Sequence, residues 1–152
     1  MLRNMRRVAA GVAAAALVVA GLASASSTHK VSAALNATQE IPKQVHKVPK
    51  AKGSFTGTLS TGGGRALLRW KLTYSGLSGK AISANIQVGK RGHTGDVLIP
   101  LCASRCKSGL TGTSSFGSDV ADKLERGQTY VNVRTRKNRK GEIRGQVKVV
   151  NR

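Results

Sequence analysis

The sequence predicts an all-β domain, either an antiparallel β-sandwich or a Greek-key barrel, with one short helix near residues 118–126. Short segments of alternating polarity follow one another along the chain, and turns rich in glycine and other polar residues separate them. The segment 65–74 alternates over its whole length except at Leu67. Helical signals are confined to 118–127, which ends in glycine.

Segment 65–74 is the clearest predicted strand. Its period of two indicates an antiparallel strand with one buried face and one solvated face. The face expected to be buried carries Ala66, Leu68, Trp70, Leu72 and Tyr74. The opposite face carries Arg65, Arg69, Lys71 and Thr73. Burying a Trp70-sized ring is worth about 3 kcal/mol or more, so we expect this side chain at the centre of the core.

The remaining strands are expected on both sides of this segment. They fall at residues 31–38, 54–59, 81–88, 97–101, 109–115, 130–135 and 141–149. Glycines 62–64 predict a hairpin turn, since glycine accepts positive φ. In strand 81–88 we expect Ile82, Ala84, Ile86 and Val88 to point inward, and Ser83, Asn85 and Gln87 to point outward. The last two strands are expected to form a hairpin around the cationic turn 136–140.

The first 25 residues are predicted to be a signal peptide. Three arginines precede an apolar run, and Ala23-Ser24-Ala25 is typical of a cleavage site. The apolar run is short for a membrane anchor. We therefore expect a secreted protein, extracellular or associated with the cell envelope, whose residues 26–152 form a single domain with its core at about 31–150. No transmembrane segment is expected after cleavage.

Charge is the strongest indication of a partner. The mature chain would keep 23 of the 26 Lys and Arg residues against six acidic ones, a net charge of +17. Such a chain attracts polyanions, although a generally basic secretome or a solubility effect would explain the charge equally well. The candidate polyanion-binding residues are Lys43, Lys47, Lys50 and Lys52 in a proline-flanked segment, Arg136, Lys137, Arg139 and Lys140 in the last turn, and the adjoining Arg134. Sequence-specific nucleic acid binding is not expected, because the few aromatic residues are needed in the core.

Cys102 and Cys106 are the only cysteines, and in an exported protein such a pair predicts a disulfide. The enclosed loop is short, so its closure contributes only about 2 kcal/mol. A metal pair is the rival interpretation, but two thiols without nearby histidines make a poor site.

Four stretches stand out in chain order: Leu35-Asn-Ala-Thr-Gln-Glu-Ile-Pro42, Leu72-Thr-Tyr-Ser-Gly-Leu-Ser-Gly79, Ala84-Asn-Ile-Gln with Gly95-Asp-Val-Leu-Ile-Pro-Leu101, and Tyr130-Val-Asn-Val with Gly141-Glu-Ile-Arg-Gly-Gln146. In this order they resemble the CHRD domain, a family of extracellular domains that is widespread in secreted bacterial proteins. The resemblance spans about 31–149 and implies an immunoglobulin-like or superoxide-dismutase-like fold. It also implies secretion and binding to protein or matrix, without an established reaction.

The chain departs from the family pattern at three histidine positions, which Asn85, Gln87 and Arg134 occupy here. Three imidazoles on these outward faces could converge on a metal, but amides and an arginine are poor ligands. We therefore expect no metal and no cofactor. His93 is expected in a loop, as polar surface rather than as a ligand.

The sequence leaves three functions open. The first is a non-enzymatic binding module that uses its basic loops on an extracellular or envelope polyanion or protein. The second is a metal-dependent enzyme of superoxide-dismutase-like fold, but no Ser, His and Asp signature and no carboxylate pair supports catalysis, and no catalytic residue is expected. For Glu40 and Glu142 we expect local hydrogen bonding or pairing with arginine. The third is a structural envelope protein without a discrete ligand. The oligomeric state stays open.

Overall fold

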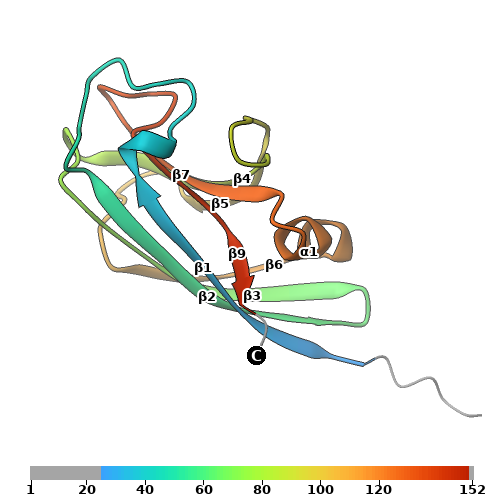
Figure 1. Cartoon of the computed structure of the whole chain (residues 1–152). Helices are drawn as coiled ribbons and strands as arrows, with labels where there is room; N and C mark the ends of the chain where they lie inside the picture. Colours follow the sequence, from blue (N-terminus) through green and yellow to red (C-terminus); the bar gives the residue numbers. More distant parts are fainter. Residues whose placement is uncertain (1–24, 151–152) are drawn as a thin grey trace, which may run out of the picture.

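The computed structural model describes residues 25–150 and shows one antiparallel sheet of nine strands that curls into a nearly closed barrel (Figure 1). The strands follow the order β5-β4-β7-β8-β1-β2-β3-β6, and β9 pairs with β1. Their bounds are β1 Ser27–Asn36, β2 Lys52–Gly62, β3 Arg65–Ser75, β4 Ala81–Val88, β5 Val97–Cys102, β6 Leu110–Gly117, β7 Thr129–Thr135, β8 Ile143–Gln146 and β9 Lys148–Val150. The all-β prediction is confirmed. The predicted signal peptide, 1–25, lies outside the described residues apart from its last residue.

The β2–β3 hairpin forms where the glycine run predicts it. Gly62 pairs with Arg65, and the two residues between them are glycines with φ of 58° and 76°. L-residues rarely adopt such angles, which explains why the turn consists of glycine. The strands on both sides are longer than predicted, and β1 begins at Ser27 and ends in a 3-10 turn, η1, at Ala37–Gln39.

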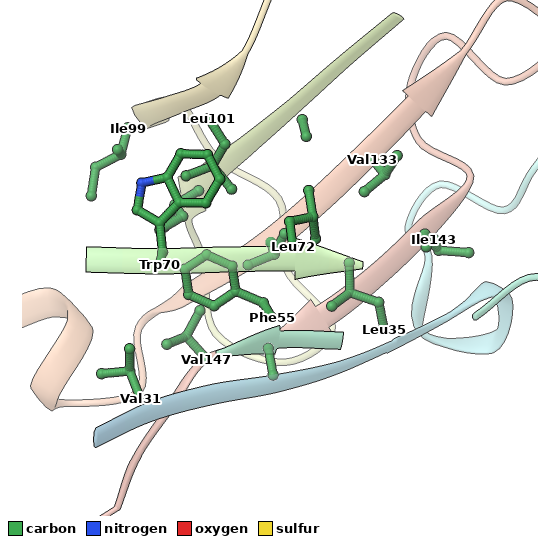
Figure 2. Packing of buried hydrophobic residues seen from close by; sticks show 14 of the residues in the cluster. Val31, Leu35, Phe55, Trp70, Leu72, Ile99, Leu101, Val133, Ile143 and Val147 are labelled. Atoms are coloured by element: carbon green, nitrogen blue, oxygen red, sulfur yellow. The ribbon is translucent and has the colours of Figure 1, made fainter. Parts of the chain in front are cut away.

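The core fills the inside of the curled sheet (Figure 2). Leu68, Trp70 and Leu72 are 0 %, 7 % and 1 % exposed, as the alternation of β3 predicts. The Trp70 ring projects from β3 toward Ile99 and Leu101 of β5, across the barrel. Its indole nitrogen donates a hydrogen bond of 3.1 Å to the Ser114 hydroxyl of β6, so the one polar atom of the ring has a partner.

Strand β4 departs from the predicted alternation. Ala81 pairs with Thr135 and Ser83 pairs with Arg134, so Ile82 is an extra residue without a counterpart in β7. A bulge of this kind turns a side chain away from its regular face. As a result Ala81 is buried, whereas Ile82, predicted to point into the core, is only half-buried.

The final predicted strand is divided in two. Val133 pairs with Ile143, as the predicted hairpin requires. Val147 then lies between β8 and β9, and Val149 pairs with Val31 of β1 rather than with β7. β8 therefore lies between β7 and β1, and β9 continues along β1 alone.

The single helix among the described residues is α1, Ser118–Glu125, at the predicted position. Ala121 and Leu124 are its buried residues, so one face packs against the sheet and the other is solvated. Gly117 caps its N-terminus without a side-chain hydrogen bond. In Figure 1 the helix lies on the side of the barrel away from η1 and the loop that follows it.

Replacing Gly112 with alanine is expected to lower the free energy of unfolding by about 2 kcal/mol, because overpacking forces a well-packed ring to move. Gly112 pairs with Trp70 across β3 and β6, and an added Cβ would lie 2.3 Å from a carbon of the indole ring. Chemical denaturation measures the loss. Gly79→Ala is the control, since its added Cβ would meet no heavy atom within 4 Å. Equal stability of the two variants would contradict the packing of Trp70 against Gly112.

Candidate functional site

Two basic loops that are far apart in the sequence lie side by side. One joins η1 to β2, and the other joins β7 to β8 (Figure 1). Asn138 connects them, because its side chain accepts a hydrogen bond from the backbone N–H of His46 and donates one to the His46 carbonyl, both at 2.8 Å. Asn138 is 2 % exposed, so this paired bond is shielded from water. We call this pair of loops the basic platform: residues 42–50 and 136–141.

The buried carboxylate of Glu142 is hydrogen-bonded to the platform through Asn138. It accepts hydrogen bonds from the backbone N–H of Ser78 and from Thr135 Oγ1 and Asn138 Nδ2, each at 2.8 Å, and from the Ser78 hydroxyl. Burial alone would raise the pKa of Glu142, but these donors outweigh it and hold the pKa below its ordinary value. A charged carboxylate therefore joins the turn before β4 to the turn before β8. The expectation of local hydrogen bonding is confirmed for Glu142.

Five of the predicted polyanion-binding residues gather at the surface of the platform. They line a depression of about 380 Å³: Lys43 from the first loop, and Arg136, Lys137, Arg139 and Lys140 from the second. All five side chains are exposed. Val45, 94 % exposed, also lines the depression. The structure thus places cations from both sequence clusters on one side of the molecule.

The other four candidates lie elsewhere. Lys47 and Lys50 are exposed on the first loop but do not line the depression. Lys52 begins β2, opposite Ser75, and lines a separate depression. Arg134 is half-buried on the outer face of β7, where its guanidinium donates to Gln87 Oε1 at 3.2 Å. These positions are therefore not part of the shared basic depression.

The outer face of β4, β7 and β8 carries a buried polar layer that the sequence reasoning did not predict. Its side chains meet through the strand register: Asn85 opposite Asn132, Gln87 opposite Tyr130, Asn132 opposite Arg144, and Tyr130 opposite Gln146. The Arg144 guanidinium also stacks on the Tyr130 ring at 3.5 Å from its centroid. Alternation predicts the outward direction of Asn85 and Gln87 correctly, but these side chains are only 8 % and 5 % exposed.

The loop 89–96 and its neighbours cover this layer. Arg144 donates to the backbone carbonyls of Lys90 and His93 at 3.1 and 2.6 Å. Gln87 donates to the Gly95 carbonyl at 2.8 Å, and Gln146 donates to the Gly89 carbonyl at 2.8 Å. These polar side chains point outward but donate to the backbone of a loop instead of to water. The one sequence signal for a special role of these residues was that they lie within the motifs that resemble the family.

Glu40 enters the polar layer from the segment after η1. It is fully buried, and its Oε1 accepts from Asn132 Nδ2 at 3.1 Å and from the Ile41 backbone N–H at 3.3 Å. Oε2 has no hydrogen-bond partner within residues 25–150. Burial raises the pKa of Glu40 to about 7, and the hydrogen bonds and the Arg144 and Arg134 charges only partly offset that effect.

Of the three positions at which the resemblance implies histidine, two are joined through their side chains. Arg134 reaches Gln87 from the neighbouring strand, and Asn85 follows on the same face of β4. Arg134 and Gln87 form a hydrogen bond, and an arginine with two amides does not make a set of metal ligands. Within residues 25–150 no group of three His, Cys, Asp or Glu side chains could hold a metal ion. The His93 side chain is exposed in its loop. The absence of a metal, a cofactor and catalytic residues stays a prediction.

The disulfide between Cys102 and Cys106 is present, with 5.7 Å between the two Cα atoms. It closes the loop that leaves β5 and leads toward β6. The predicted bridge is confirmed.

Fold and site together define an antiparallel β domain with cationic loops at one end and a buried polar layer beside them. A family model for the CHRD domain matches residues 31–147. The chain belongs to the CHRD domain family, and the resemblance carried by the four sequence stretches is confirmed. CHRD is a non-catalytic domain family found in extracellular proteins, which suggests a binding module. Compared with curated proteins and with solved structures, the chain has no significant match. No helix in the described part of the chain is long and apolar enough to cross a membrane.

Proposed function

We propose that this chain is a secreted, non-enzymatic CHRD-domain protein that binds anionic partners outside the cell or at its envelope through the basic platform. The observation that carries the proposal is the joining of both loops by Asn138, which brings Lys43 to the four cations of the β7–β8 turn. Charges held close together act on one polymer segment, whereas charges scattered over a surface do not.

The chemistry of the platform suits phosphate, sulfate or carboxylate groups along a polymer. Arg136 and Arg139 present planar forks that bind two oxygens, and Lys43, Lys137 and Lys140 add a less directional attraction. Among the described residues, those that line the depression include no acidic one. Backbone hydrogen bonds to Asn138 fix the loops before binding, which reduces the entropy lost on association.

Replacing Arg136, Lys137, Arg139 and Lys140 together with glutamine is expected to weaken binding to a soluble anionic polymer such as heparin at least about tenfold. The melting temperature should change little, since all four side chains are exposed. Titration calorimetry across a salt series measures the affinity, and the salt dependence should become shallower because fewer counterions are released.

The control removes the same charge from another face. Lys30, Arg65, Arg69 and Lys71 are exposed on β1 and β3, and their replacement with glutamine should weaken binding much less. Equal losses in the two variants would mean that overall charge, and not the platform, binds the polymer. Retention of the wild-type protein on native envelope material that salt does not release would instead favour a structural envelope protein held by a specific protein contact.

A further inference from the structure

A second cavity lies beside the platform and takes its lining from different elements. Its volume is about 620 Å³, within the range of small-molecule sites. The start of β4 lines it together with the disulfide loop after β5, and Arg136 is the only platform residue that reaches it. This cavity could not be predicted from the sequence, because its walls come from segments that are separate along the chain.

The floor of the cavity is apolar. Ile82, the extra residue of the β4 bulge, lines the cavity instead of entering the core. Ala81 and the disulfide at Cys106 continue this surface, and both residues are buried. A half-buried isoleucine on a bulge keeps apolar area in contact with water, and a ligand that covers it would gain the hydrophobic free energy of that area.

The rim of the cavity is cationic. Lys80, Arg105, Lys107 and Arg136 are all exposed, and no carboxylate is among the lining residues. Arg105 has a φ of 53°, a conformation that is uncommon for residues other than glycine and that often occurs at functional positions. The bridge from Cys102 to Cys106 encloses Arg105, so the covalent loop constrains the backbone from which this side chain extends.

We propose that this cavity binds an amphiphilic anion, a phosphate, sulfate or carboxylate head group on a single apolar chain. The chain covers Ile82 and the disulfide, and the head group lies among the rim cations. An apolar floor without cations would accept a neutral apolar chain, and cations without an apolar floor would accept any small anion. Because the cavity has both, it favours a ligand that carries an anionic head group and an apolar chain in one molecule. This site does not rest on the proposed function of the platform.

The test uses octanesulfonate, which is charged at every accessible pH, below its micellar concentration. Titration calorimetry is expected to show that it binds at least about tenfold more tightly than methanesulfonate, which has the same head group, or octanol, which has the same chain. Equal binding of methanesulfonate would reduce the cavity to a general anion site. Equal binding of octanol would show that the rim cations take no part. Either result would overturn the proposal.

Two substitutions locate the site. Arg105→Gly removes a rim cation and suits the backbone angle at that position, so it should lower octanesulfonate affinity about tenfold while the protein stays folded. Ile82→Ser removes the apolar floor and should lower the affinity by a similar factor. The controls are Lys71→Gln, which removes an exposed cation from β3, and Val45→Ser, which removes an exposed apolar side chain from the platform. Affinities that fall equally in variants and controls would place the ligand elsewhere.

Removal of the disulfide by substitution supplies an independent measurement. The double variant Cys102→Ser with Cys106→Ser should lose octanesulfonate binding, because the loop no longer holds Arg105 over the floor. Its circular dichroism and melting curve report separately on folding. Heparin binding should be unchanged in Arg105→Gly, so failure of this proposal and failure of the platform proposal are distinguishable. Full octanesulfonate affinity in the folded double variant would exclude the loop as a wall of the site.

Discussion

Replacing Glu142 with alanine is expected to lower the free energy of unfolding by about 3 kcal/mol and, although it removes a negative charge, to weaken binding to an anionic polymer. The carboxylate is fully buried and accepts hydrogen bonds from Ser78, Thr135 and Asn138. Alanine removes the charged acceptor that these donors share. Hydrogen bonds to a charged group contribute about 1.5–3 kcal/mol each but do not add fully, which leads to the expected total.

The effect on binding follows from the position of Asn138. Its side-chain nitrogen contacts both Glu142 Oε1 and the His46 carbonyl, so loss of the carboxylate removes one of the contacts that orient this amide. The amide is then held by the His46 backbone alone, so the two basic loops are joined less rigidly. The change in net charge alone would give the opposite result, because removal of an acidic residue makes the protein more cationic and should strengthen polymer binding.

Thermal denaturation and heparin titration measure the two effects. For a domain of this size a loss of about 3 kcal/mol lowers the melting temperature by about 10 °C. Glu125→Ala is the matched control, because it removes the same charge from an exposed position in α1. That variant should keep its stability and bind the polymer equally or more tightly. Stronger polymer binding by a folded Glu142→Ala protein would show that the platform does not depend on this carboxylate.

The stability of the wild-type protein is expected to fall by about 3 kcal/mol as the pH rises from about 5 to about 8, owing to Glu40. The ordinary pKa of the group is 4.5, and burial raises it to about 7 in the folded protein. The folded state therefore holds the proton more tightly than the unfolded state. The stabilisation is fully present below pH 4.5 and is lost as the pH rises through about 7.

The physical cause is the environment of the carboxyl group. Glu40 is 0 % exposed and Oε2 has no hydrogen-bond partner. Ionisation would place a charge where water is absent, and the attraction of the Arg144 and Arg134 charges is too small to compensate. The neutral acid is consequently favoured over a wider pH range than in an exposed glutamate.

Comparison of the wild type with Glu40→Gln isolates the contribution of this carboxyl group, because every other titratable group is present in both proteins. The variant keeps the shape of the side chain without its titration, so its stability should equal that of the wild type near pH 5 and exceed it near pH 8. Denaturant unfolding at a series of pH values measures the difference. If Glu40→Gln were the less stable protein near pH 8, the carboxylate would be acting as a charged partner of Arg144, and the prediction would be wrong.

The core of this protein could be read from the sequence because strand alternation is a local property. Trp70 and its neighbours on β3 are buried as the period of two predicts, and the hairpin at the glycine run has the expected geometry. The disulfide between Cys102 and Cys106 was equally accessible to sequence reasoning. The same reasoning placed the helix at 118–126, within one residue of α1.

The sites depended on contacts that alternation does not describe. Alternation predicts which face of a strand carries Asn85 or Gln87. It does not predict that a loop will bury that face. It also assumes an unbroken strand, so the bulge that turns Ile82 into the second cavity was not predicted.

By itself the sequence determined the class of fold, the family and the presence of two cationic clusters, because composition and period are properties of neighbouring residues. Only the tertiary structure decided that part of each cluster shares one depression, since Asn138 and His46 meet across 92 positions of the chain. The sheet brings those loops to the same end of the barrel through the pairing of β7, β8 and β1. Hydrogen bonds between distant backbone and side-chain groups then set their separation, and no local pattern contains that information.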